Sequence, residues 1–369
     1  MSKWADIDAR PAGEIAATTI VAGIPLFIRP LRQLARQGWA HARVLVGDDQ
    51  QAETVWRCLR LHPVPHTMAV EVVRADKAGS GAALTLSASA IYLSDDLAAA
   101  HSAGTRPAAA IEIRQRSDMR AAEHMLYARI RKSVDADGLF AHYLIRPLTV
   151  PLTRMLLGTR VSPNQVTITA LLAGLCAAAC AADGTRSLTI TAGLLYWLGN
   201  AIDCIDGDLA RLRLQSSKMG EWLDSMTDEI STFTLLAGLG VGLWHSHAGR
   251  EWLILGLAGS VVGALTVARL YLELHRRRMP IDSAQFPWFF QDAGAPKPDP
   301  PGAPASLLGR VGRLLTFLVR RDANVTIVAA LLIVDLRQWA VALMALGIAF
   351  GAALTVVHFV VMARRRVRA

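Results

Sequence analysis

Cysteine is scarce in this sequence, with four residues among 369. Three of them, Cys176, Cys180 and Cys204, lie in or beside apolar runs, and none has the spacing to histidine that a metal site needs. Such cysteines behave as small buried residues, so neither disulfides nor a zinc site is expected. The first residues, MSKWADIDARPAGE, also lack the apolar core of a signal peptide, so we expect the N-terminal part to stay in the cytoplasm.

The chain also has no recognisable nucleic-acid-binding motif, although its net charge is +9. The basic residues cluster beside apolar runs, as in cytoplasmic loops that contact anionic headgroups. The clusters are Arg276, Arg277 and Arg278; Arg310, Arg313, Arg320 and Arg321; and Arg364, Arg365, Arg366 and Arg368. We therefore expect membrane lipids as partners and no nucleic acid.

Apolar residues are distributed unevenly, although they make up 53% of the chain and the mean hydropathy is +0.33. The first 135 or so residues resemble an ordinary soluble protein, whereas long apolar runs begin near residue 160. Runs of roughly 20 residues are long enough to cross a bilayer as helices. The predicted spans are 164–183, 187–206, 220–245, 251–273, 323–336 and 338–362. The loop 279–305 is too polar to span.

The segment 139–160 mixes apolar residues with arginines and prolines, which favours an amphipathic helix at the membrane interface. With the N-terminus inside, the outer turns hold only Arg186, Arg250 and Arg337. The positive-inside rule therefore predicts a multi-pass protein of the inner, cytoplasmic membrane with both termini in the cytoplasm. It also places residues 207–219, expected to be a turn, on the cytoplasmic side.

The N-terminal part alternates predicted strands with helices. ARVLVGDD (42–49), MAVEVVRA (68–75) and ASAIYLSDD (88–96) indicate strands, and QAETVWRCLRL (51–61) indicates a helix. This order favours a parallel α/β sheet. A further helix is expected over 117–133, with Ser117 as its N-cap. The predicted organisation is an α/β domain (1–135), a linker with an interfacial helix (136–162) and a six-span membrane domain (163–369).

Four carboxylates stand at the inner ends of two predicted spans. Asp203 and Asp206 are three residues apart near the end of span two, and Asp224 and Asp228 are four apart near the start of span three. Each pair shares a helical face, and antiparallel packing would bring all four together. Unpaired anions at this depth are costly, and oxygen ligands suit Mg²⁺ or Mn²⁺. Two such ions could form a clamp for phosphoryl chemistry.

These aspartates belong to a longer pattern, D-x2-D-G-x2-A-R-x8-G-x3-D-x3-D, which the sequence matches at every position. The matching residues are Asp203, Asp206, Gly207, Ala210, Arg211, Gly220, Asp224 and Asp228. The pattern resembles the signature of the CDP-alcohol phosphotransferase family. SPNQVT (162–167), before the first span, resembles the segment where family members enter the membrane.

The resemblance implies an enzyme that transfers a phospho-alcohol or phosphatidyl group from a CDP-alcohol to an acceptor hydroxyl and releases CMP. It implies that the four aspartates bind two divalent metals and that Asp228 is also the general base. The residues implied to bind the nucleotide are Asn164, Asp203, Gly207, Ala210, Arg211, Gly220 and Asp224. The acceptor could be an inositol phosphate, another alcohol or a lipid, and Arg269, Arg320 and Arg321 could bind it if it is anionic.

The soluble part resembles sugar-phosphate-type nucleotidyltransferases at VAGIPLFIRPLRQLARQGW (21–39) and IYLSDD (91–96). As a whole, the chain is similar to fused inositol-phosphate cytidylyltransferase and di-myo-inositol-phosphate phosphate synthase proteins. It lacks their Gly-rich phosphate-binding loop, and Ile24 stands where their segment has lysine. A triphosphate needs backbone N–H groups and cations, so we expect a degenerate domain in which Asp95 and Asp96 are turn residues.

Two other functions remain open at the level of sequence, namely an acidic-site metal transporter and a non-catalytic nucleotide sensor. The absence of an internal repeat speaks against the transporter, and the complete set of aspartates speaks against the sensor. GLGVG (238–242) and the pair Gly259 and Gly263 place small residues on spans three and four. They could serve either contacts within the chain or the homodimer that the family resemblance favours.

Overall fold

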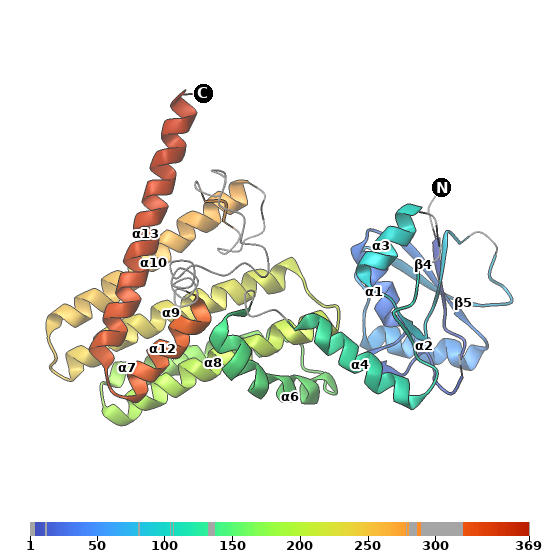
Figure 1. Cartoon of the computed structure of the whole chain (residues 1–369), viewed down its shortest axis with the longest axis horizontal. Helices are drawn as coiled ribbons and strands as arrows, with labels where there is room; N and C mark the ends of the chain where they lie inside the picture. Colours follow the sequence, from blue (N-terminus) through green and yellow to red (C-terminus); the bar gives the residue numbers. More distant parts are fainter. Residues whose placement is uncertain are drawn as a thin grey trace, which may run out of the picture. The chain divides into compact units, whose positions relative to one another are not determined.

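The computed structural model describes residues 4–11, 13–79, 82–103, 105, 107–131, 137–277, 279, 286–288 and 320–368 (Figure 1). The predicted loop 279–305, apart from these few residues, lies outside them, as do Arg278, Arg310 and Arg313. The chain divides into two compact units. The first comprises residues 1–131, 154–160 and 208–215, and the second comprises residues 132–153, 161–207 and 216–369.

The first unit contains a four-stranded parallel sheet in the order β5-β4-β1-β6. Its strands are β1 (Trp4–Asp8), β4 (His41–Val46), β5 (Ala69–Arg74) and β6 (Leu84–Ser87). This arrangement confirms the parallel sheet and the strands predicted near 42–49 and 68–75. The strands β1 and β6 were not predicted from the sequence. In β1 the acidic Asp6 hides the strand pattern, and its carboxylate is buried against Arg43 of β4 at 2.7 Å.

Helices and two short antiparallel strand pairs complete this unit. They are α1 (Ile28–Arg36), α2 (Asp49–Leu61), α3 (Ser94–Ala103) and α4 (Arg116–Ile130), with β2 (Ile20–Val21) paired to β3 (Ile24–Pro25) and β7 (Ala90–Ile91) paired to β8 (Ile111–Glu112). The strand predicted over 88–96 is therefore mostly wrong. Only two of its residues pair, antiparallel, and α3 already begins at Ser94, because Ser94, Asp95 and Asp96 suit the first turn of a helix.

The predicted N-cap of α4 is also wrong. The N-cap is Gln115, two residues before Ser117. The Asp118 carboxylate accepts hydrogen bonds at 3.0 Å from the backbone N–H groups of Arg114 and Gln115, which satisfies donors at the helix start. These two backbone hydrogen bonds lower the pKa of Asp118.

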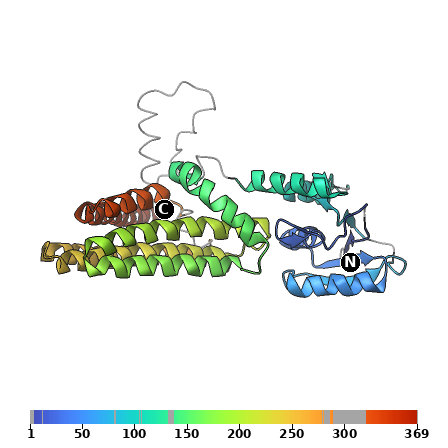
Figure 2. The same cartoon turned by 90° about the horizontal axis from the view of Figure 1, so that it is seen from below.

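The second unit is a bundle of long helices that run side by side (Figure 2). They are α7 (Pro163–Asp183), α8 (Arg186–Leu212), α9 (Lys218–His245), α10 (Arg250–Arg276), α12 (Arg321–Ile333) and α13 (Arg337–Arg368). Within the described residues, α7, α8, α10 and α13 are long and apolar enough to cross a membrane. The chain is a multi-pass membrane protein. The other two predicted spans coincide with α9, which carries the charges of the motif, and α12, which has 13 residues.

The turn predicted over 207–219 is shorter in the structure. Helix α8 continues to Leu212 and α9 begins at Lys218, which leaves residues 213–217 between them. Leu209 and Leu212 are buried, so the end of α8 has an apolar face that favours continued helix. Ser217 caps α9 by accepting a hydrogen bond from the N–H of Gly220 at 3.0 Å.

Small residues allow the helices of the bundle to approach closely. A Cβ atom at Gly238 or Gly242 of α9 would meet backbone carbonyls of Ala178 and Ala181 on α7. At Gly240 it would lie 2.9 Å from the carbonyl oxygen of Trp252 on α10. The glycines of the GLGVG segment therefore serve packing within the chain, which is one of the two roles that the sequence left open.

At the end of the bundle opposite the aspartates, charged residues hold the helix termini together. Arg337 donates to the carbonyl oxygen of Gly184 and pairs with Asp335 at 2.9 Å. Asp335 also lies 4.0 Å from Arg186. The ends of α7 and α12 and the starts of α8 and α13 therefore meet, as the predicted antiparallel order of these helices requires.

The segment predicted to lie at the membrane interface is helical. It comprises a π-helical turn (Ala141–Ile145) followed by α6 (Arg146–Leu157), which includes Pro151. The large apolar side chains that it exposes are Tyr143, Leu144, Leu148, Leu152 and Met155. Their three- and four-residue spacing places Leu144, Leu148, Leu152 and Met155 along one stripe of the helix.

Candidate active site

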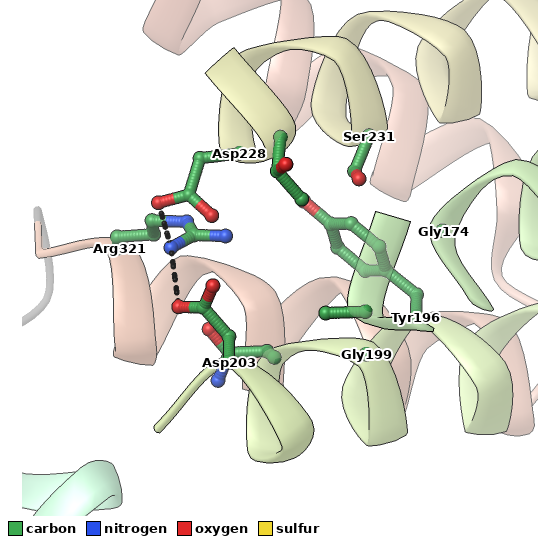
Figure 3. A pocket seen from close by; sticks show the side chains of 10 residues that line it. Gly174, Tyr196, Gly199, Asp203, Asp228, Ser231 and Arg321 are labelled. Carbon is green, nitrogen blue, oxygen red and sulfur yellow. Dashed lines mark hydrogen bonds and ion pairs between the residues drawn. The ribbon is translucent and has the colours of Figure 1, made fainter. Parts of the chain in front are cut away.

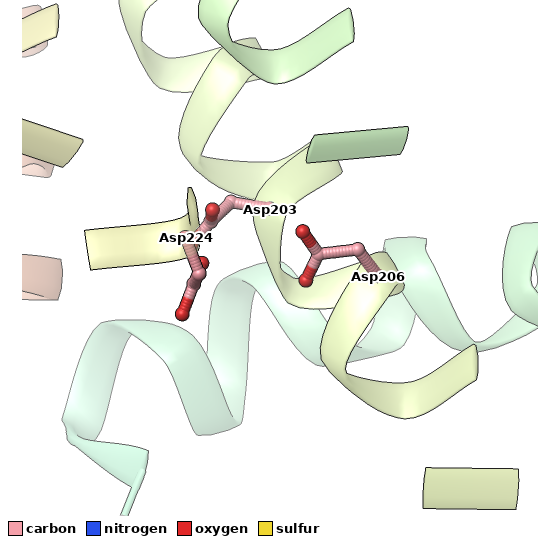
Figure 4. A group of neighbouring side chains, drawn as sticks. All are labelled: Asp203, Asp206 and Asp224. Carbon is pink, nitrogen blue, oxygen red and sulfur yellow. The ribbon is translucent and has the colours of Figure 1, made fainter. Parts of the chain in front are cut away.

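Three of the four aspartates converge where α8 and α9 meet (Figure 4). Asp203 and Asp206 lie on α8 and Asp224 lies on α9, and one carboxylate oxygen from each is within 4.8 Å of the others. The helical spacing of the motif and the antiparallel packing of its two helices produce this group, as the sequence predicts. Three hard oxygen donors this close together suit a divalent cation.

Asp206 has a partner that the sequence analysis did not single out. The hydroxyl of Thr167, on the first turns of α7, donates a hydrogen bond to the buried Asp206 carboxylate. Thr167 ends the SPNQVT segment, which begins with the N-cap residue Ser162. That segment therefore does more than start α7, because it fixes the orientation of one aspartate.

Asp228 lies outside the group of three and contacts a cation instead. Its carboxylate forms an ion pair with Arg321, the first residue of α12, and the same guanidinium nitrogen is 3.3 Å from Asp203 (Figure 3). The second oxygens of Asp203 and Asp228, both Oδ1, are buried and have no hydrogen-bond partner among the described residues. Carboxylate oxygens without partners at a buried site fit a metal-binding role, because an uncompensated anion there is costly.

A small pocket lies beside Asp228 and Asp203, with room for about one water molecule. Its other polar lining residues are Tyr196, Asn200, Thr227, Ser231 and Arg321. The Tyr196 hydroxyl is hydrogen-bonded to Thr232 at 3.2 Å, whereas the buried Thr227 hydroxyl has no partner among the described residues. No motif position includes these residues, and only the packing of α7, α8, α9 and α12 brings them together.

The predicted nucleotide-binding residues occupy the same two helices and the start of α7. The side-chain oxygen of Asn164 lies 3.6 Å from the point where a Cβ atom on Gly220 would stand, so these two positions are neighbours. Gly207 and Ala210 follow the aspartates on α8. Arg211, also on α8, pairs with the buried Asp208 at 2.7 Å, an interaction that the motif did not reveal. Its Nε remains without a partner among the described residues.

The three predicted acceptor-binding arginines have different surroundings. Arg321 contacts two of the aspartates, and Arg320 is the residue before it, at the N-cap of α12. Arg269 of α10 pairs with Glu273 at 3.5 Å and stacks on the ring of Phe359 at 3.8 Å. It lines a groove between α10 and α13 together with mostly apolar residues.

Comparisons with known proteins agree with this site. The family model described as CDP-alcohol phosphatidyltransferase matches residues 160–295. The chain is 32% identical over 133 residues to a bifunctional IPC transferase and DIPP synthase of Thermococcus kodakarensis, which covers 36% of this chain and 30% of that protein. A protein of the same name from Aquifex aeolicus is 29% identical over the same length, with the same two shares.

An archaetidylinositol phosphate synthase of Pyrococcus horikoshii is 35% identical over 102 residues, which cover 27% of this chain and 53% of that protein. The matches thus span about a third of the length of the bifunctional relatives and about half the length of the archaetidylinositol phosphate synthase. The family match covers both helices that carry the aspartates and the start of α7 that holds Thr167. Residues 160–295 of this chain are therefore similar to CDP-alcohol phosphatidyltransferases.

Proposed function

We propose that this protein is a membrane phosphotransferase that moves a phospho-alcohol or phosphatidyl group from a CDP-alcohol to an acceptor hydroxyl and releases CMP. The observation that carries the proposal is the convergence of Asp203, Asp206 and Asp224 within 4.8 Å, inside a domain of this family. A metal transporter and a nucleotide sensor are not favoured, because the family match covers the aspartate site itself.

The four aspartates would hold two divalent ions, Mg²⁺ or Mn²⁺. When bound, such ions neutralise phosphate oxygens and polarise the phosphorus centre for attack. Asp203, Asp206 and Asp224 supply the ligand group, and Thr167 orients Asp206. Two features of the chain fit this role: the acidic oxygens converge, and Oδ1 of Asp203 and Oδ1 of Asp228 lack other partners among the described residues.

The remaining motif residues would bind the CDP moiety. Gly207 and Gly220 have no side chains, so a pyrophosphate can approach the backbone of both helices. Asn164 is a neighbour of Gly220, the small side chain of Ala210 would leave room on α8, and the planar guanidinium of Arg211 can neutralise a phosphate oxygen. Asp228 would take the proton from the acceptor hydroxyl, because it stands apart from the three-aspartate group and one helical turn deeper than Asp224.

The donor and acceptor are proposed only by class. The relatives are named for DIPP synthesis and for archaetidylinositol phosphate synthesis, so an inositol phosphate or a lipid hydroxyl is the acceptor to test first. Arg320 and Arg321, at the start of α12, are placed to neutralise an anionic acceptor. Arg269 would act only on a ligand in the α10–α13 groove. This chemistry belongs to phospholipid or inositol-phosphodiester biosynthesis.

We propose six spans, the four identified helices together with α9 and α12, in the inner membrane with both termini in the cytoplasm. Residues 136–162 would form the linker and interfacial helix, since α6 exposes an apolar stripe that can enter the headgroup region. A homodimer also remains a proposal. Its support is the family resemblance, because the GLGVG glycines are used within the chain.

Residues 1–135 would form a degenerate cytidylyltransferase-like domain. Ile24 is completely buried in the core of the unit, so the position of the missing lysine faces no ligand. The nearby Arg29 is buried and donates to the carbonyl oxygens of Val21 and Ala22, and burial lowers its pKa to about 10. The Arg29 guanidinium is therefore engaged by backbone carbonyl groups, which supports a structural or regulatory role for the domain.

The test is an assay of the purified full chain in detergent with a panel of CDP-alcohols and acceptors, in which CMP release is measured. We expect release only with Mg²⁺ or Mn²⁺ and a complete loss in excess EDTA, because the aspartates need a counter-charge. Restoration by added Mg²⁺ would show that EDTA did not denature the protein. Full turnover in excess chelator would refute the proposed mechanism.

A further inference from the structure

Arg321 lies between Asp228 and Asp203 and pairs with both carboxylates. One of its guanidinium nitrogens, Nη1, contacts Oδ2 of both aspartates (Figure 3). Asp206 and Asp224 complete the three-aspartate group with Asp203, and Asp228 does not belong to that group. The site therefore has two halves, one built of three carboxylates and one in which two carboxylates share an arginine.

The arginine and a divalent ion cannot both use these oxygens. A guanidinium stays charged at any pH that a protein experiences, so Arg321 cannot lose its proton to make room. A divalent cation within a few ångströms of it would be strongly repelled in this partly buried site. Asp228 can bind a metal ion through the oxygen it now shares only after Arg321 has moved away.

Arg321 has the freedom to move. It is the first residue of α12, where no neighbouring turn of the helix precedes it, and its side chain is 39% exposed. Asp203 and Asp228 are more buried, with side chains 15% and 20% exposed. A long, half-exposed side chain at a helix start can swing towards another anion while the aspartates stay in place.

We propose that Arg321 competes with a divalent cation for Asp228, and that an anion which takes up the Arg321 guanidinium strengthens metal binding at this half of the site. The inference rests on the proposed function, since it concerns the same aspartates. Arg321 is thus a positioning residue, which holds Asp228 away from metal until an anionic acceptor arrives. By linkage, bound metal must strengthen anion binding by the same factor.

The first experiment measures Mn²⁺ binding to the full chain in detergent by calorimetry and by the spin-resonance signal of free Mn²⁺. We expect a tighter and a weaker class of site in the unaltered protein. Arg321→Gln should tighten Mn²⁺ binding at the weaker class about tenfold. Arg321→Lys should bind Mn²⁺ with an affinity between those of the unaltered protein and Arg321→Gln, because lysine keeps the positive charge but lacks the planar guanidinium. Arg186→Gln, which removes a positive charge at the other end of the bundle, should change neither class.

The second experiment repeats the titration with sodium sulfate in place of sodium chloride at equal ionic strength. Sulfate should tighten the weaker Mn²⁺ class in the unaltered protein and in Arg186→Gln, and should have no effect in Arg321→Gln. This comparison needs no turnover, and the unaltered protein and Arg321→Lys remain informative even if Arg321→Gln folds poorly.

The outcomes separate this inference from the proposed function. The competition would be overturned if Arg321→Gln and Arg321→Lys bound Mn²⁺ with unchanged affinities. It would also be overturned if sulfate had no effect on the unaltered protein, or had an equal effect on the unaltered protein and on Arg321→Gln. If neither the unaltered protein nor any of the variants bound Mn²⁺, that result would instead overturn the metal site on which the proposed function depends.

Discussion

At the scale of single residues, the aspartates of the site differ in the side chains that they contact. Asp206 receives a hydroxyl hydrogen bond from Thr167, and Asp228 faces a guanidinium. Identical side chains can therefore have different roles because their neighbours differ. Substitutions at the aspartates and at Thr167 test this division.

Asp228→Asn should remove turnover while CDP-alcohol binding stays largely intact. Asparagine keeps the size and one oxygen but cannot take a proton, and loss of a general base typically lowers a rate by about 10²–10⁴-fold. Asp203→Asn and Asp224→Asn should weaken metal and nucleotide binding as well, because both residues belong to the three-aspartate group. Turnover and CDP-alcohol affinity are measured for each variant.

Near-normal turnover of Asp228→Asn would show that another group is the base. Loss of binding as severe as in Asp224→Asn would show that Asp228 acts mainly as a metal ligand.

Thr167→Val should weaken Mn²⁺ binding and CMP release by about 10–100-fold, since the lost hydroxyl no longer orients Asp206. Thr169→Val is the matched control. Thr169 is exposed, and its hydroxyl donates at 2.9 Å to the carbonyl oxygen of Gln165 in its own helix. Equal Mn²⁺ affinities in the two variants would contradict a role for Thr167 at the metal site.

At the scale of elements, the position of α9 between α7 and α10 decides where Asp224 and Asp228 stand. That position depends on glycines whose missing side chains admit neighbouring backbone. The same residues could have been read as a surface for a second copy of the chain. Their contacts within the chain connect helix packing directly to the geometry of the site.

Gly242→Ala should destabilise the protein by about 1–3 kcal/mol, because the added methyl group would collide with the backbone of Ala181 on α7. Gly347→Ala on α13 is the control, since nothing lies within 4 Å of its Cβ position. Alanine is more favourable than glycine within a helix by up to about 1 kcal/mol, so the Gly347→Ala control should be neutral or slightly stabilising. Thermal unfolding in detergent compares the two. A similar loss of thermal stability in Gly242→Ala and Gly347→Ala would refute close α7–α9 packing at Gly242.

At the scale of the whole molecule, the two units differ in what they can do chemically. The family match lies in residues 160–295, and the parallel sheet of the first unit lies outside it. We expect the full chain to release no pyrophosphate from CTP and a phospho-alcohol, since Ile24 is buried and Arg29 is engaged by backbone. The same preparation should release CMP from its CDP-alcohol. Pyrophosphate release that depends on Asp95 or Asp96 would disprove degeneracy.

Much of this protein follows from local pattern. The motif residues are fixed by short spacings along two helices, so Asp203, Asp206 and Asp224 could be predicted to meet. Long apolar runs likewise predicted α7, α8, α10 and α13, because hydropathy over about 20 residues decides whether a helix can cross lipid. The strands β4 and β5 were recognisable from their alternating apolar residues.

Only the tertiary structure decided the rest, because it depends on residues distant in sequence. Asp6 could be tolerated within the central strand β1 only because Arg43 lies beside it on β4. Thr167 and Arg321 reach the aspartates from α7 and α12, and no spacing relates them to the motif. The sequence by itself determined which carboxylates share a helix face, because such spacing is a local matter. The partner of each aspartate was decided by the packing of four helices.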